Sequence, residues 1–202
     1  MARNWMLIAV CGLALASPTE QPMHRLPQPH YERLGSDPEW LAYAAQFHGH
    51  LGPWATAGTR LGMAGLREVD AKGYFDVEVI CEGPFLKPPK SCFLDGIQVA
   101  TGATWGKRNL HCGRTPTDEI VVRVRNVRTG AQAEARPTAK LMDLLGSFQP
   151  RVKAAGANGI GQKTQDDRDA DHAVEALARE IAAIPDCEIL VVSRTEDARQ
   201  HE

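Results

Sequence analysis

The stretch around which this chain is organised reads Phe47-His48-Gly49-His50-Leu51-Gly52-Pro53. It holds two histidines one residue apart, with the freely bending Gly49 between them. Further along, Cys92 stands at the start of an apolar run. Imidazole nitrogens and a thiolate sulfur are ligands that suit a soft divalent metal. The pattern therefore makes His48, His50 and Cys92 candidate metal ligands.

The His-x-His spacing is compatible with a shared ion in some local structures and not in others. Inside a helix the two rings would point about 200° apart and could not meet at one ion. In a turn, glycine allows both rings to converge, and Gly52-Pro53 directly after His50 favours a turn. The alternative is that both histidines interact with the carbonyl end of the preceding helix. The spacing alone leaves both interpretations open.

Helices are predicted on both sides of this turn. The first begins near Ser36 or Asp37, either of which can act as the cap, with Pro38 in its first turn, and it stops at Gly49. The second runs over 53–69 and contains Gly58, Gly62 and Gly65. Each glycine costs roughly 1 kcal/mol relative to alanine in a helix. We therefore expect close packing of this helix against another helix or a ligand.

A third helix is predicted to begin at Ser91 and to end at Gly102. Cys92 then lies in its first turn, where free backbone amides favour a thiolate. Asp95, one turn later, could accept a hydrogen bond from a ligating imidazole or act as a general base. The alternatives are that Cys92 is a small apolar core residue and that Asp95 only complements the helix dipole.

The stretch Gly106-Lys107-Arg108 follows this helix in a polar loop or short strand. Its backbone amides and positive charges suit an anion. It resembles a phosphate-binding loop only superficially, because the glycine spacing upstream is absent. Lys107 and Arg108 are therefore candidates for binding an anionic substrate.

The remaining pattern predicts an α+β fold with a mixed or antiparallel sheet, packed helices and a single core domain. Residues 149–169 are rich in Gly, Ala, Lys and Asp and are predicted to form a linker or mobile loop. The other predicted elements are strands over 75–81, 119–127, 131–136 and 187–192 and helices over 137–145 and 171–184, the helix over 137–145 being ended by Gly146.

The amino terminus has the form of a signal peptide over residues 1–16, with an apolar run followed by Ala14-Leu15-Ala16. The apolar run is too short to cross a bilayer of about 30 Å, so no membrane span is expected after signal removal. Lipoprotein processing at Cys11 is the alternative, although Val10 is bulky for it. The expected location is the periplasm or the extracellular medium. A Pro-rich arm over 17–35, the domain over 36–193 and a charged tail over 194–202 complete the predicted organisation.

The amino-acid composition and net charge limit the classes of partner that the protein is expected to bind. The 202 residues are 43% hydrophobic and carry a formal net charge of −2, so a nucleic-acid partner is not expected. Export would also permit disulfides among Cys81, Cys92, Cys112 and Cys187. Four thiols can pair in three ways, and a metal-bound Cys92 would leave an odd number. The sequence does not choose between these states.

Three motifs lie in order over 47–53, 91–98 and 101–109. Together they resemble the FmdE family, which takes its name from a component of formylmethanofuran dehydrogenase. The resemblance implies an α+β core, a homodimer and a His/Cys metal pocket to which zinc is commonly assigned. It implies that His48, His50 and Cys92 form that pocket. The reaction of the family is not established, so the resemblance says more about the site than about the function.

The chain departs from many relatives at Gly52 and Ala103, where they carry cysteine, and it has no Cys-x-x-Cys for a carboxy-terminal zinc finger. Three ligands would leave an open coordination position, which is the arrangement of a catalytic or ligand-sensing zinc. One hypothesis is an enzyme acting on a small anionic substrate, with Asp95 or Gln98 orienting metal-bound water and Lys107 or Arg108 binding the substrate. The other is a non-catalytic protein that binds or senses a metal or a small ligand.

Overall fold

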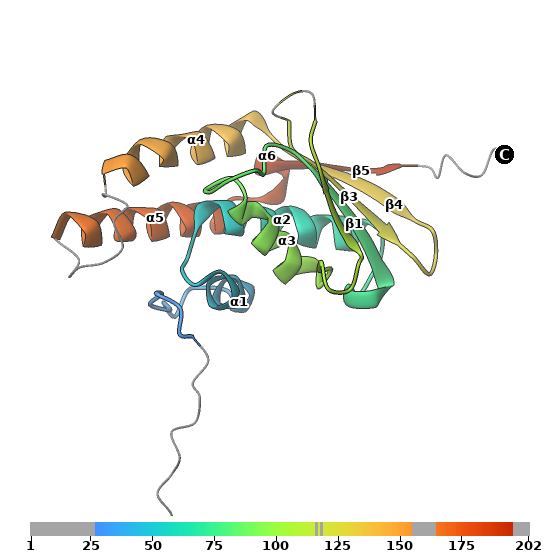
Figure 1. Cartoon of the computed structure of the whole chain (residues 1–202), viewed down its shortest axis with the longest axis horizontal. Coiled ribbons are helices and arrows are strands. Elements are labelled where there is room, and N and C mark those ends of the chain that lie inside the picture. The colour runs from blue at the N-terminus through green and yellow to red at the C-terminus, as the bar shows by residue number, and fades with distance from the viewer. Residues whose placement is uncertain (1–26, 116, 118, 155–164, 196–202) are drawn as a thin grey trace, which may run out of the picture.

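The fold is built around one mixed sheet, and helices pack against this sheet (Figure 1). The computed structural model describes residues 27–115, 117, 119–154 and 165–195, and only the backbone of 148–154 and 165–168. Within these residues the sheet has five strands in the order β2-β1-β3-β4-β5. Their bounds are β1 Val77–Glu82, β2 Leu110–Gly113, β3 Val121–Asn126, β4 Gln132–Pro137 and β5 Leu190–Thr195. β1 and β2 are parallel, and the other pairs are antiparallel.

The helices of the described residues are α1 Glu39–His48, α2 Pro53–Glu68, α3 Cys92–Thr101, α4 Ala139–Ala154, α5 Gln165–Ala183 and the short α6 Asp186–Ile189. None of the helices in the part of the chain described is long and apolar enough to cross a membrane. Figure 1 shows α4 and α5 side by side, extending beyond the sheet. The α+β fold with a mixed sheet and packed helices is therefore confirmed.

The main core lies between α2 and the inner face of the sheet. Leu61 of α2 packs in one cluster with Val79 of β1 and Val124 of β3, all of them buried. Period-two alternation brings these strand residues to one face of the sheet. A second, smaller cluster joins α1 to α5 through Leu41, Ala45, Leu51 and Ala178. The segment from α1 to α2 therefore packs against α5 through α1 and Leu51, and against the sheet through α2.

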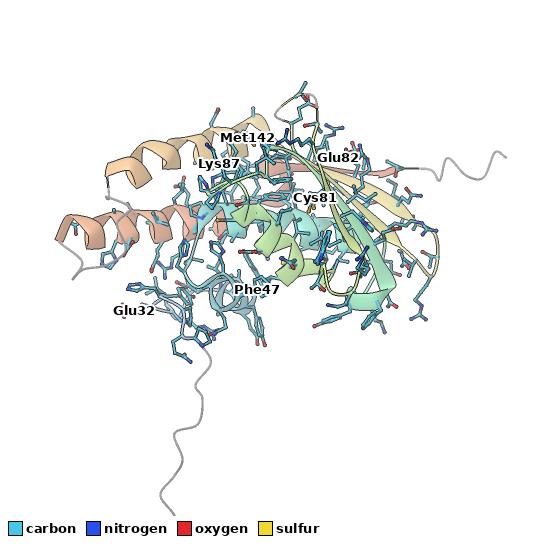
Figure 2. The ribbon with its side chains drawn as sticks, in the orientation of Figure 1. Glu32, Phe47, Cys81, Glu82, Lys87 and Met142 are labelled. Carbon is cyan, nitrogen blue, oxygen red and sulfur yellow. The ribbon has the colours of Figure 1, made fainter. Side chains whose placement is uncertain are left out.

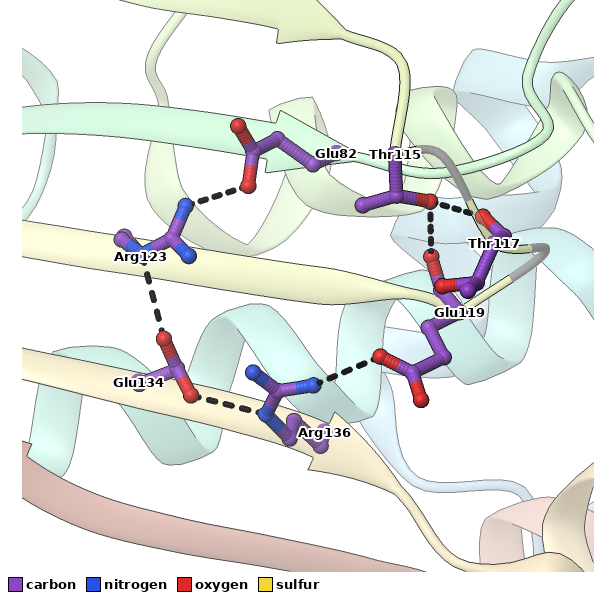
Figure 3. A network of polar contacts seen from close by, with 7 residues as sticks. All are labelled: Glu82, Thr115, Thr117, Glu119, Arg123, Glu134 and Arg136. Atoms are coloured by element: carbon purple, nitrogen blue, oxygen red, sulfur yellow. Dashed lines mark hydrogen bonds and ion pairs between the residues drawn. The ribbon is translucent and has the colours of Figure 1, made fainter.

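The outer face of the sheet carries a polar network instead of a helix layer (Figure 3). Arg123 donates hydrogen bonds to Glu82 and to Glu134, and Arg136 donates to Glu134 and to Glu119. Arg123 and Arg136 are each about two-fifths exposed, so such pairs contribute little individually, about 0–1 kcal/mol. These ion pairs make this face of the sheet polar, so it can face solvent.

Two predicted element boundaries are wrong, the first because a glycine does not end its helix. Gly146 was expected to end a helix, but α4 continues through it to Ala154. Leu141 and Leu145, just before it, are fully buried, and this packing offsets the roughly 1 kcal/mol that an interior glycine costs. Helix also covers 149–154 and 165–169 of the predicted linker, since α5 begins at Gln165. The central part of that linker, 155–164, lies outside the described residues.

Smaller corrections concern the starts of elements. The cap of α1 is Pro38, with no side-chain cap hydrogen bond, while the Asp37 carboxylate binds elsewhere. The first part of the strand predicted over 75–81 belongs to a short 3₁₀ helix, Tyr74–Asp76. The start of the last predicted strand is instead the helix α6, which follows its cap residue Pro185 and leads into β5. The predicted signal peptide and residues 17–26 of the arm, with 196–202 of the tail, lie outside the described residues.

Candidate functional site

The His48-Gly49-His50 turn joins α1 to the chain that leads into α2. His48 is the last residue of α1, and Gly49 follows with a left-handed φ of 93°, which glycine adopts without strain. The Gly49 N–H donates to the carbonyl of Ala45 and so closes the end of α1. The two imidazole rings come together, with centroids 4.5 Å apart.

Both Nε2 atoms border the same small space beside Gly52. A Cβ atom placed on Gly52 would lie 3.2 Å from Nε2 of His50 and 3.4 Å from Nε2 of His48. These contacts are tighter than most that real Cβ atoms make. Glycine at this position therefore leaves room between the two histidines. A side chain in its place would occupy that room.

The orientation of His48 is set by Asp95 on α3. Nδ1 of His48 lies 2.6 Å from Oδ2 of Asp95, a hydrogen bond between residues far apart in the sequence. The His48 side chain is only 9% exposed, and its Nε2 atom is buried with no hydrogen-bond partner. A hydrogen-bonded Nδ1 leaves Nε2 as the nitrogen that can bind something else.

Cys92 lies beside the same ring. It is the first residue of α3 and is partly buried. The hydrogen bond to Asp95, and after it an interaction with the Cys92 sulfur, raise the pKa of His48 to about 9, against the opposing effect of burial. Ser91 holds the predicted cap position of α3, although its side chain makes no cap hydrogen bond. The structure thus places His50, Cys92 and Asp95 each next to His48.

Glycines at the crossing of α2 and α3 explain how Cys92 reaches the histidines. A Cβ on Gly58 would lie 2.0 Å from the carbonyl oxygen of Phe93, and a Cβ on Gly96 would lie 1.9 Å from the carbonyl oxygen of Ala55. The two helix backbones are therefore nearly in contact. The close packing predicted for the glycine-rich helix is confirmed, and its partner is α3.

The residue types of His48, His50 and Cys92 suit a metal ion, but their arrangement does not form a complete site. Among the described residues, no group of three or more His, Cys, Asp or Glu side chains is arranged so that it could hold a metal ion. The buried Nε2 of His48, the space beside Gly52 and the soft donors nevertheless match what zinc binds. The ligand set His48, His50 and Cys92 therefore stays a prediction, supported by the convergence of its members.

A cleft of about 1020 Å³ opens next to His48. His48, Gln98 and Lys107 all line it. Lys107 Nζ lies 3.1 Å from Oγ1 of Thr104 and 5.9 Å from the centroid of the Phe75 ring. Arg108, in contrast, is exposed, stacks over the Trp105 ring at 5.5 Å and is not part of the cleft lining. Of the two candidate anion-binding residues, only Lys107 shares a cleft with the histidine.

Most of the remaining lining is apolar or aromatic, and sequence reasoning did not identify it. Phe47 on α1, labelled in Figure 2, is 55% exposed, and Tyr43 and Tyr74 are also largely exposed. Other apolar members are Trp40, Met63, Pro27, Pro29, Val99 and Ala100. These residues come from α1, α2, α3, the segment before α1 and the turn before β1, so no local period links them. Exposed aromatic rings gathered in one cleft are typical of a ligand or partner site.

The comparison with family models agrees with the motif pattern. The family model described as FmdE, molybdenum formylmethanofuran dehydrogenase operon, matches residues 47–191. Among solved structures, the chain is similar to an FmdE-like protein of tungsten formylmethanofuran dehydrogenase type from Syntrophus aciditrophicus. The two are 15% identical, with a TM-score of 0.46, over 81% of this chain and 74% of that one. No curated protein matches the chain.

Proposed function

The chain belongs to the FmdE family, and from this premise we propose that it binds one divalent transition metal ion, zinc in the first instance, through His48, His50 and Cys92. The ion would lie beside Gly52, where both imidazole Nε2 atoms converge. The proposal includes a small organic anion as the ligand or substrate of the adjacent cleft.

The buried Nε2 of His48 is the observation that carries this proposal. A buried polar atom without a partner costs about 1–3 kcal/mol. By distance and angle Nε2 has no hydrogen-bond partner, and the Cys92 sulfur, which raises the pKa of His48, is the group placed to share a ligand with it. A metal ion would satisfy this atom, and the Asp95 carboxylate already holds the opposite side of the ring in the matching orientation.

The residues of the cleft suggest what the ligand looks like. Lys107 would pair with a negative group, and Gln98 can both donate and accept a hydrogen bond. The aromatic and apolar lining would hold an apolar body and exclude water from it. A bound zinc ion would supply a Lewis acid or a water molecule of lowered pKa at the histidine end of this cleft. An aromatic or branched aliphatic carboxylate has this combination of features.

A second function, non-catalytic binding or sensing, is favoured by the composition of the cleft. Among the described residues that line it, no side chain is a carboxylate or a thiol. The Asp95 carboxylate, on the far side of the His48 ring, is already bonded to that ring. General acid or base groups for a reaction would then come from the imidazole, from Lys107, from the tyrosine hydroxyls or from metal-bound water.

Elemental analysis of protein purified without chelators tests the metal. We expect about one transition metal ion per chain in the wild type and almost none in His48→Ala or His50→Ala. His111→Ala is the matched control, because His111 is exposed on β2 and lies outside this group. Equal metal content in the wild type and in both site variants would refute the proposed ligands.

A thermal-shift screen of carboxylates, with and without metal, then separates the two functions. A compound that stabilises only the metal-loaded protein, and stabilises Lys107→Met less, occupies the proposed cleft. Chemical analysis of that compound after incubation distinguishes an enzyme, which converts it, from a binding protein, which leaves it unchanged.

A further inference from the structure

Two cysteines face each other across the parallel pair of strands β1 and β2. The register aligns Val79 with Leu110, Ile80 with His111 and Cys81 with Cys112. Val79 and Leu110 are both buried, so they mark the inner face of the sheet. Side chains alternate with a period of two, so Cys81 and Cys112 return to that same face. Figure 2 labels Cys81 on the sheet, beside Glu82.

The spacing of these strands suits a disulfide bond. Adjacent strands lie about 4.7–4.9 Å apart, and the Cα atoms of disulfide-bonded cysteines lie about 4.4–6.8 Å apart. β2 is at the edge of the sheet among the described strands, and it spans only Leu110–Gly113. A short edge strand can shift by the small amount needed to bring the two sulfur atoms together.

The other described cysteines are placed for different roles. Cys92 lies beside His48 at the candidate metal site. Cys187 lies in α6, directly before β5, and β5 forms the opposite edge of the sheet from β2. Of the pairings that the sequence left open, the register favours one.

We propose that Cys81 and Cys112 form a reversible intramolecular disulfide that ties β2 to β1, by exchange with low-molecular-weight disulfides such as oxidised glutathione. The Cys112 thiolate attacks one sulfur of the small disulfide and releases one small thiol. Cys81 then attacks the Cys112 sulfur of the mixed disulfide and releases the second thiol. Two cysteine sulfurs are oxidised and one small disulfide is reduced to two thiols. The two protons that the cysteines lose are taken up, through solvent, by the two small thiolates that leave.

The order of attack follows from exposure. Cys112 is exposed and Cys81 is fully buried, so only Cys112 is open to a reagent in solution. Burial raises the pKa of both thiols, which keeps the thiolate fraction small at neutral pH. The bond should therefore form slowly, and faster as the pH rises.

The disulfide would close a loop of the chain that carries several residues of the candidate site. The chain between Cys81 and Cys112 includes the whole of α3 and the loop with Lys107. Cys92, Asp95 and Gln98 all belong to this segment. Its oxidation would therefore restrain the segment that presents these residues, whether or not a metal is bound.

Peptide mapping of the full chain tests the proposal. Purified wild-type protein is incubated with oxidised glutathione, alkylated and digested without reduction. We expect a cystine peptide that joins Cys81 to Cys112, and the loss of two free thiols per chain. Cys112→Ser should lose this peptide and keep the Cys81 thiol, while Cys187→Ser, the matched control, should form it like the wild type.

A stability measurement gives a second readout. In the loop-closure model the bond should raise the melting temperature of oxidised wild type by about 10 °C over the reduced protein, and Cys112→Ser should show no such rise. A Cys112 that carries only a glutathione adduct, or that pairs with Cys92 or Cys187, would overturn the proposal. So would wild-type protein that keeps both thiols after prolonged oxidation.

Discussion

Nδ1 of His48 lies 2.6 Å from Oδ2 of Asp95, which links the last residue of α1 to the first turn of α3. This single contact determines which imidazole nitrogen faces the space beside Gly52. It also connects two of the three motifs by which the chain resembles its family. The consequences for metal binding can be measured without knowing a substrate.

Replacement of Asp95 by asparagine should weaken metal binding by about 10- to 100-fold, because the carboxylate orients the ligating ring and raises its basicity. A competition titration against a chromophoric chelator measures the affinity. Asp143→Asn is the matched control, since Asp143 is an exposed carboxylate on α4. Wild-type affinity in Asp95→Asn would show that the contact plays no part in metal binding.

Gly52 can be tested with two substitutions that fill the same space. Gly52→Ala places a methyl group 3.2 Å from Nε2 of His50, so we expect weaker metal binding than in the wild type. Gly52→Cys adds a thiolate at the same point and should bind zinc more tightly than Gly52→Ala, because it supplies a further ligand. Indistinguishable affinities in the two variants would place the metal away from Gly52.

The close crossing of α2 and α3 predicts a large difference between two glycine-to-alanine changes. Gly58→Ala puts a Cβ 2.0 Å from the backbone oxygen of Phe93, so the helices must separate, and we expect a loss of about 1–3 kcal/mol or more. Gly146→Ala in α4 meets nothing within 4 Å and should stabilise the protein by about 0.5–1 kcal/mol. Urea denaturation of both variants measures the free energies of unfolding. Equal effects in the two variants would contradict the packing described.

The Asp37 cluster predicts a dependence of stability on pH. Although burial acts to raise it, hydrogen bonds from Arg179 and Tyr31 hold the pKa of Asp37 below its usual value. A carboxylate with a lowered folded-state pKa stabilises the fold above its unfolded-state pKa of about 3.9 and loses that contribution as the pH falls through the folded-state value.

The stability advantage of wild type over Asp37→Asn should therefore be constant from about pH 7 down to pH 5 and shrink below about pH 4. Urea denaturation of both proteins over this range checks the expectation. An advantage that stays the same down to about pH 2, below the usual aspartate range, would mean that the carboxylate charge contributes nothing.

Much of the fold could be predicted because local chemistry determined it. The glycines at 49 and 102 both adopt positive φ and end α1 and α3 where expected. The β3–β4 hairpin also matched its alternating pattern. Prediction failed at Gly146, where the packing of buried leucines lets α4 continue, and before β5, where the short helix α6 replaces the start of the predicted strand.

The candidate ligands His48, His50 and Cys92 were identified from the sequence alone, because residue type determines what can bind a metal and Gly49 allows a turn that no helix could provide. Only the tertiary structure decided that Asp95 holds Nδ1 of His48, that Lys107 shares its cleft while Arg108 does not, and that Cys81 faces Cys112. These relationships join segments that lie far apart in the chain. They depend on how helices and strands pack against one another, and no local period or spacing encodes that.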